Sequence, residues 1–244
     1  MKTKILAFAA LALLASSALA ATPTYLYRLY SPGVKGATAV DNLLPTASSV
    51  FATWNPADKG TAMILSPGNL TAVGNGSAFA SVRATQSESS GKWYWESTIT
   101  GANATNYGYI MTAGTSTFDL NAYLGTSSTG NYFGWYPPQT PSYSSSWPGT
   151  TVAAPPGGVN YPVGTTFMMA MDMDNHALYV GVNGTWNGGG VPTSGAAKTG
   201  AAVTGLSGTV FPAINVVTTQ STSNFGATAF KYAVPTGYHA GVFQ

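Results

Sequence analysis

At residues 90–100 the chain reads Ser90-Gly91-Lys92-Trp93-Tyr94-Trp95-Glu96-Ser97-Thr98-Ile99-Thr100. From Lys92 onward this run is rich in aromatic and β-branched residues and free of Gly and Pro, which favours a strand. Successive side chains of a strand point to opposite faces, so Trp93, Trp95 and Ile99 share one face. Large apolar side chains at alternate positions are what the inner face of two packed sheets requires. The run therefore predicts a central strand of a β-sandwich.

The rest of the chain has the same character. Beyond the first twenty residues, no stretch carries apolar residues at helical spacing without an interrupting Gly, Pro or β-branched residue. Short runs of β-branched and aromatic residues alternate instead with clusters of Gly, Asn, Ser and Pro, which is typical of a sandwich. Strands are predicted at 63–65, 70–73, 78–83, 92–100, 107–112, 166–172, 177–182, 210–217 and 226–232, with a hairpin turn at 173–176.

The N-terminus carries an export signal. Lys2 and Lys4 precede an apolar run at 5–14, and small residues lead to Ala20. This order is that of a secretory signal peptide, with cleavage expected after Ala20. The apolar run is too short to cross a bilayer, which takes about 20 residues, so no membrane insertion is expected. We predict a mature protein that is secreted or held at the cell surface, with the periplasm as an alternative.

Charge and cysteine content exclude several classes of protein. The chain has nine Lys and Arg against seven Asp and Glu, and loss of Lys2 and Lys4 leaves seven of each, a net charge of zero. Nucleic-acid binding needs clustered cations, which this chain lacks, so no nucleic-acid partner is expected. Cysteine is absent, which excludes disulfides and zinc–thiolate sites. The charged fraction of 7% favours association with other molecules or copies.

The segment at 90–96 resembles a strand of SPRY (B30.2-like) domains, with its Gly-Lys lead, alternating aromatics and Glu. Further segments resemble the family's motifs and follow in its order: Tyr107-Gly108-Tyr109-Ile110, Gly134-Trp135, Gly164-Thr165-Thr166-Phe167, Met171-Asp172-Met173-Asp174, Leu178-Tyr179-Val180-Gly181-Val182-Asn183-Gly184, Phe211-Pro212-Ala213-Ile214 and Asn224-Phe225-Gly226. An earlier segment, Trp54-Asn55-Pro56-Ala57-Asp58-Lys59, is similar to the entry segment of bacterial and phage-type members.

The resemblance covers residues 51–244. It implies an all-β fold, a two-sheet antiparallel sandwich of the concanavalin-like jelly-roll type, whose loops at one end contact peptides or other ligands. It implies no catalysis and names no ligand.

A proline- and aromatic-rich segment at 125–161 is predicted to be a long loop. Loops of this length in compact domains are usually functional or disordered, and disordered segments are poor in aromatic residues. Tyr and Trp offer a large, stiff contact area with a polar tip, which suits protein and sugar recognition. The predicted contact residues are Tyr132, Trp135, Tyr136, Tyr143 and Trp147, with Trp186 after the Asn183-Gly184 turn. For Trp135 and Tyr136, packing at the end of the sandwich is an equal alternative.

Residues 21–50 form an N-terminal arm with one strand-like run. Tyr25, Tyr27 and Leu29 share one face of that run, and Leu26 and Tyr30 lie on the other. An exposed, uncharged apolar strand is a template for pairing with another chain. We therefore expect a protein-interaction module that self-assembles through the arm into homo-oligomers or filaments. Recognition of a protein or glycan through 125–161 is the alternative, and an ordinary strand within its own subunit is the alternative for the arm.

No catalytic residue, metal site or cofactor is predicted. Asp172 and Asp174 flank a hairpin turn, where Asp favours tight backbone geometry. Glu96 is expected to hold a loop from the middle of its strand. The histidines, His176 and His239, lie outside any recognisable nucleophile motif.

Overall fold

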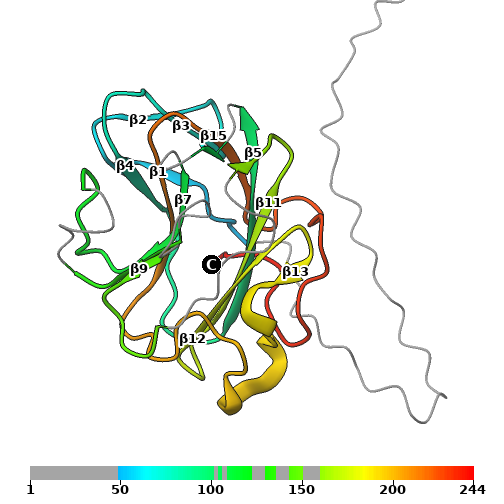
Figure 1. Ribbon diagram of the computed structural model, residues 1–244. Helices are drawn as coiled ribbons and strands as arrows, with labels where there is room; N and C mark the ends of the chain where they lie inside the picture. Colours follow the sequence, from blue (N-terminus) through cyan, green and yellow to red (C-terminus); the bar gives the residue numbers. More distant parts are fainter. Residues whose placement is uncertain (1–48, 102–103, 106–108, 123–129, 136–142, 151–159) are drawn as a thin grey trace, which may run out of the picture. The chain divides into compact units, whose positions relative to one another are not determined.

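The structure is a computed structural model that describes residues 49–101, 104–105, 109–122, 130–135, 143–150 and 160–244. Figure 1 shows two β-sheets that face each other across a shared core. Every strand pair in them is antiparallel. The predicted all-β sandwich is confirmed.

The two main sheets contain six and seven strands. The six-stranded sheet has the order β1 (Trp54–Lys59), β4 (Ala80–Ala84), β14 (Phe211–Val216), β7 (Tyr109–Gly114), β8 (Tyr132–Trp135) and β9 (Tyr143–Ser145). The seven-stranded sheet has the order β13 (Thr185–Trp186), β12 (Ala177–Val182), β11 (Thr166–Asp172), β5 (Lys92–Gly101), β15 (Gln220–Asn224), β3 (Thr71–Gly74) and β2 (Met63–Leu65).

The remaining regular elements are short. Strands β6 (Ala104–Thr105) and β10 (Asn160–Tyr161) pair with each other, and the 3₁₀ turns are η1 (Asn187–Gly189) and η2 (Pro192–Ala197). Within the described ranges, no helix has the length and apolar character needed to cross a membrane.

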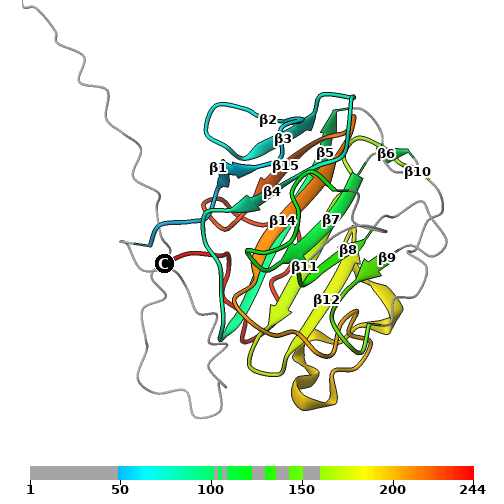
Figure 2. The same ribbon diagram turned by 90° about the vertical axis from the view of Figure 1, so that its left-hand side faces the viewer.

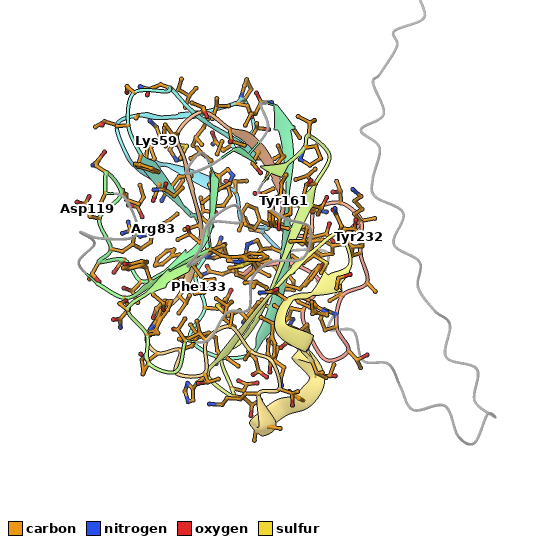
Figure 3. All side chains as sticks on the ribbon, viewed as in Figure 1. Lys59, Arg83, Asp119, Phe133, Tyr161 and Tyr232 are labelled. Carbon is orange, nitrogen blue, oxygen red and sulfur yellow. The ribbon has the colours of Figure 1, made fainter. Side chains whose placement is uncertain are left out.

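The core between the sheets combines large aromatic side chains with aliphatic residues and methionines. On β5, Trp95 and Ile99 are fully buried and Trp93 is 9% exposed, so the predicted inner face of this strand is confirmed. Trp135 of β8 meets Phe167 of β11 edge to face across the core, with ring centroids 5.8 Å apart. Figure 3 shows Phe133 and Tyr161 between the two sheets as well.

The β11–β12 hairpin has the predicted bounds, and a second tight turn follows it. Val182 pairs with Thr185, so Asn183 and Gly184 form a two-residue turn between β12 and β13. Both turn residues have positive φ, 47° and 85°, as a type I′ hairpin turn requires. Asn tolerates this conformation and Gly adopts it freely, which explains the choice of residues.

Two sequence expectations were wrong. The predicted strand at 226–232 does not form. The strand that pairs with β5 is instead β15, which was not predicted because it carries Ser and Thr in place of large apolar residues. Its inward residues Ser221 and Ser223 both hydrogen-bond Ser97 at 2.8 Å, so a polar patch takes the place of an apolar one there. The predicted loop at 125–161 contains the strands β8, β9 and β10.

The ends of the domain lie together. Val50 and Gln244 exchange backbone hydrogen bonds at 2.8 and 3.2 Å, and the rings of Phe51 and Phe243 meet edge to face. The chain therefore enters the sandwich beside its C-terminal residue. The arm residues Tyr25, Tyr27, Leu29 and Tyr30 lie outside the described residues.

Candidate partner-binding surfaces

The predicted aromatic contact residues do not gather on one exposed surface. Trp135 and Trp147 are buried in the core between the sheets, at 0% and 3% exposure. Tyr132 is buried on the opposite face of β8, in a cluster with Phe118 and Ala213. In this conformation the three predicted side chains pack inside the domain.

The other predicted residues lie elsewhere or are not described. Trp186 is half-buried on the outer side of the seven-stranded sheet and meets Tyr94 edge to face, with centroids 6.3 Å apart. Tyr143 begins β9, and its backbone pairs with that of Trp135. The side chain of Tyr143 and all of Tyr136 lie outside the described residues.

Four of the buried tryptophans leave a polar group without a partner. The indole N–H groups of Trp135 and Trp147 have no acceptor in the described part of the chain, and those of Trp54 and Trp95 share this property. A buried donor without an acceptor loses its hydration with no compensating bond, which typically costs about 1–3 kcal/mol. These groups are candidates for a hydrogen bond to a bound molecule or an ordered water.

Glu96 holds a loop, as predicted. Its carboxylate is 3% exposed and accepts hydrogen bonds from the Tyr94 hydroxyl at 2.7 Å and from the backbone N–H groups of Lys231 and Tyr232 at 2.9 Å each. Burial raises the pKa of Tyr94 far above its ordinary value, and the bond to Glu96 raises it further. The hydroxyl therefore stays protonated and donates. Glu96 fastens the C-terminal segment onto the sheet.

The two aspartates near the hairpin also have structural partners. Asp172 is fully buried; it lies 2.7 Å from the Nζ of Lys92 and accepts two hydrogen bonds from Asn175 across the turn. Asp174 accepts a bond from the N–H of Gly91 at 2.7 Å. The predicted turn role of this pair is confirmed.

The histidines differ in their surroundings. The His239 ring stacks on Trp93, with centroids 4.1 Å apart and planes 18° from parallel, whereas His176 is exposed in the β11–β12 turn with φ of 57°. The described residues contain no group of three or more His, Cys, Asp or Glu side chains that could hold a metal ion.

Glu88 is an ionisable group with an unusual environment. Its backbone exchanges hydrogen bonds with Val210 at 2.9 and 2.8 Å, which draws the β4–β5 loop against the entry to β14. Within the described residues its Oε1 is buried without a hydrogen-bond partner. Burial raises the pKa of Glu88 to about 7. The carboxylate is therefore disfavoured in the folded domain at neutral pH.

We expect Glu88→Gln to raise the melting temperature at pH 8 and to leave it nearly unchanged at pH 4. The unfolded chain ionises Glu88 near pH 4.5 and the folded domain near pH 7, so wild-type stability falls as the pH rises through this window. Gln does not titrate and loses this dependence. Thermal melts from pH 4 to pH 8, with Asp119→Asn as an exposed control, measure it. A difference between variant and wild type that is constant across pH would contradict the assignment.

Both sheets carry cover on part of their outer faces. The 115–122 segment lies over the six-stranded sheet and brings Phe118 and Leu120 against Tyr132. On the seven-stranded sheet, the C-terminal segment and η2 cover the β11–β12 side, where Tyr238 donates to the Pro192 carbonyl at 3.0 Å. Figure 1 shows the C-terminal segment, in red, beside β11 and β13. The other half of this outer face has no such cover among the described residues.

A row of threonines runs from Thr166, which is buried at the border of the covered side, into that uncovered half. Thr166 of β11, Thr98 of β5, Thr222 of β15 and Thr71 of β3 stand directly opposite one another on four adjacent strands. Figure 2 shows β2, β3, β15 and β5 side by side in this part of the sheet. We call this surface the threonine face; its residues are Ile64, Thr71, Val73, Thr98, Thr100, Thr166, Gln220 and Thr222.

Hydrogen bonds between side chains order the threonine face. Thr71 and Thr222 share one at 2.8 Å, Thr98 and Thr166 another at 2.8 Å, and Thr100 reaches Thr222 at 3.1 Å. Thr100 is exposed, Thr71, Thr98 and Thr222 are half-buried, and Thr166 is buried. The face is therefore a preorganised array of hydroxyl and methyl groups.

The threonine face has no charged member, and its apolar end is open. Ile64 is 53% exposed, among the most exposed large apolar side chains of the described residues, and its strand neighbour Val73 is half-buried. Two described cations lie at its borders: Lys231, whose Nζ donates to Thr166 at 3.3 Å, and Lys59, whose Nζ donates to the carbonyl of Met63, next to Ile64, at 2.8 Å. The sequence analysis missed this surface because it missed β15. Alternation of Thr98 and Thr100 with inward residues in β5 was the available signal.

The sheet ends at β1 and β2 are protected against edge pairing. Lys59 donates through its Nζ to the Met63 carbonyl of the short strand β2 at 2.8 Å. β1 contains Pro56 and a register irregularity. Lys, Pro and bulges are the usual means of blocking an edge. At the other ends of the two sheets, β9 and β13 contain no Lys or Pro.

Comparisons with known proteins bear on the fold. No protein-family model matches the sequence, and a search of curated proteins finds no match. Among solved structures, the chain is similar to the SPRY domain of human HERC1, with a TM-score of 0.52 and 12% identity over 72% of this chain and 99% of that one.

Two further structures are more distant. Stonustoxin has a TM-score of 0.45 and 19% identity, over 72% of this chain and 27% of that one. The TRIM65 PSpry domain has a TM-score of 0.42 and 13% identity, over 72% and 92%. The likeness to the HERC1 domain extends over nearly all of that domain, and together with the two antiparallel sheets it shows that this chain has the SPRY-type β-sandwich fold.

Proposed function

We propose that this chain is an exported, non-catalytic interaction module of bacterial or phage type, which assembles with copies of itself through its N-terminal arm. The observation that carries the proposal is the run at 25–30, which presents apolar side chains on both faces and is interrupted by a single charge, Arg28. An apolar strand of this kind is a template for pairing with another chain, which supports the arm's use between subunits. Export and bacterial origin rest on the signal peptide and on the Trp54–Lys59 segment.

Four of the described carboxylates have structural roles, which supports a non-catalytic role for the domain. Glu96, Asp172 and Asp174 are occupied by structural hydrogen bonds, and Asp58 pairs with Arg83 at 2.8 Å. A general acid or base must be free to reach a substrate. The proposal would be contradicted if the wild-type protein turned over a substrate and the Asp172→Asn variant, with its fold intact, did not.

We further propose that the arm is exchanged between subunits. The described chain that follows it enters the sandwich at Val50, whose backbone pairs with that of Gln244. A strand donated to a neighbour's sheet makes a head-to-tail contact, which need not close into a ring and so propagates. The β1 and β2 edges are blocked, so the proposed acceptors are β9 and β13.

We expect the mature protein, residues 21–244, to form oligomers or filaments and the variant lacking residues 21–32 to be a folded monomer. Sedimentation velocity over a range of concentrations, with circular dichroism for the fold, measures both. Replacing Tyr25, Tyr27 and Leu29 with Ser is the matched control for chain length and should also give a monomer. A deletion variant that unfolds, or a full-length protein that is monomeric at every concentration, would contradict the proposal. Export predicts an intact mass that begins at Ala21.

A second candidate is recognition of a protein or glycan through the 125–161 segment, with Tyr132, Trp135, Tyr136, Tyr143, Trp147 and Trp186 as the proposed contact residues. Trp186 favours it, because this side chain is half-buried on the outer side of the seven-stranded sheet and keeps part of its ring accessible. A ligand found by screening should bind about tenfold more weakly to Trp186→Ala, which removes the ring. Unchanged affinity would exclude this contact.

A further inference from the structure

The composition of the threonine face limits the chemistry of the partner that it can bind. It presents hydroxyl groups, which both donate and accept hydrogen bonds, interspersed with methyl groups and the exposed Ile64. A charged partner finds no counter-charge among its eight residues. A glycan finds neither an aromatic ring to stack on nor a carboxylate to accept from its hydroxyls. The partner must therefore be neutral and itself rich in hydroxyl and methyl groups.

A second copy of the same surface meets this description. In a two-fold contact the same patch faces itself, so it must be complementary to itself. A charged face repels its own copy, whereas hydroxyls pair with hydroxyls and methyls pack on methyls. We propose that the threonine face packs against the threonine face of a second copy, related by a two-fold axis near Thr222. Thr222 lies on β15, the middle strand of β11, β5, β15, β3 and β2.

The size of the face sets the strength of this contact. Five strands at about 4.8 Å spacing give a width of roughly 19 Å. Two rows of residues along the strands make a patch well below the ~800 Å² per partner of a standard stable interface. The isolated contact is therefore weak and appears at high protein concentration. Where arms link subunits into a chain, as the proposed function holds, repeated weak faces add up and join neighbouring chains side by side.

The absence of cysteine allows a direct test on the full mature protein. We would place one cysteine at a time, in Thr222→Cys and in Thr193→Cys, an exposed position on η2 that serves as the matched control. Facing sheets pack about 10 Å apart, which exceeds the Cα spacing of a disulfide, so a short bismaleimide is the suitable cross-linker. We expect T222C to give a cross-linked dimer with a yield that rises with concentration, and T193C to give background.

A charge placed on the face should break the contact. Val73→Lys, added to T222C, places one lysine on each copy, so two like charges face each other across the two-fold axis. We expect each lysine to weaken association about tenfold, which gives a loss of about a hundredfold for the pair. The circular dichroism of this variant should match that of the parent, since Val73 points outward. Equal cross-linking of T222C and T193C would overturn the inference, as would cross-linking of T222C that Val73→Lys leaves unchanged.

The outcomes separate this inference from the arm proposal. Oligomers that vanish on deletion of 21–32, with background cross-linking of T222C, would support the arm and overturn the face. Cross-linked dimers in a protein that forms no larger assemblies would support the face and contradict the arm. Binding to an insoluble neutral polysaccharide that Val73→Lys abolishes, without cross-linking, would show that a glycan occupies the face instead.

Discussion

Trp95→Ala should lower the free energy of unfolding by about 3–5 kcal/mol, a large part of the ~5–15 kcal/mol typical of a domain. Trp95 is fully buried at the centre of β5, whose two neighbours are β11 and β15. Removal of the indole leaves a cavity that this rigid sheet cannot close, so the lost contacts are not regained. Urea denaturation followed by circular dichroism measures the change.

A companion variant separates volume from polarity at this position. Trp95→Phe keeps most of the ring and removes the indole N–H, which has no acceptor in the described part of the chain. Trp95→Phe should therefore lower the free energy of unfolding much less than Trp95→Ala, because it keeps most of the ring and removes an unsatisfied donor. If both variants unfolded at the wild-type denaturant concentration, Trp95 would not lie in the core.

Arg83→Met should be the most damaging substitution of a charged residue, again by about 3–5 kcal/mol. The Arg83 side chain is 4% exposed and forms an ion pair with Asp58 at 2.8 Å. Its guanidinium also donates to the backbone carbonyls of Thr115 and Phe118 and lies 4.3 Å from the Phe118 ring centroid. Met fills much of the same volume but leaves these acceptors without a donor. The 115–122 segment should then detach from the six-stranded sheet.

Lys59→Met is the matched control for this prediction. Lys59 is a half-buried cation with one described hydrogen bond, to the Met63 carbonyl at 2.8 Å, so its loss should cost about 0.5–1.5 kcal/mol. Figure 3 shows Lys59 and Arg83 on the same side of the domain, near Asp119. Urea midpoints of the two variants give the comparison. Equal effects would mean that the Arg83 network adds nothing beyond a single half-buried hydrogen bond.

The features that the sequence alone determined are those set by neighbours along the chain. Alternation of large and small residues placed Trp93, Trp95 and Ile99 on the inner face, as observed. The Asn183-Gly184 pair specified its turn because few residues adopt positive φ without strain. Asn224 likewise acts on its neighbours along the chain, since its side chain donates to the carbonyls of Thr228 and Ala229.

The tertiary structure decided which polar runs become strands and which aromatic rings remain exposed. β15 reads as a loop in isolation, and it is a strand because Ser221 and Ser223 find Ser97 more than a hundred residues earlier in the chain. The sequence around Trp135 does not show whether this side chain contacts a partner or fills the core. It is buried because the facing sheet packs against it. Likewise, the threonine face exists because strand pairing aligns threonines from four separate segments. Such alignment depends on long-range register, which local side-chain patterns do not encode.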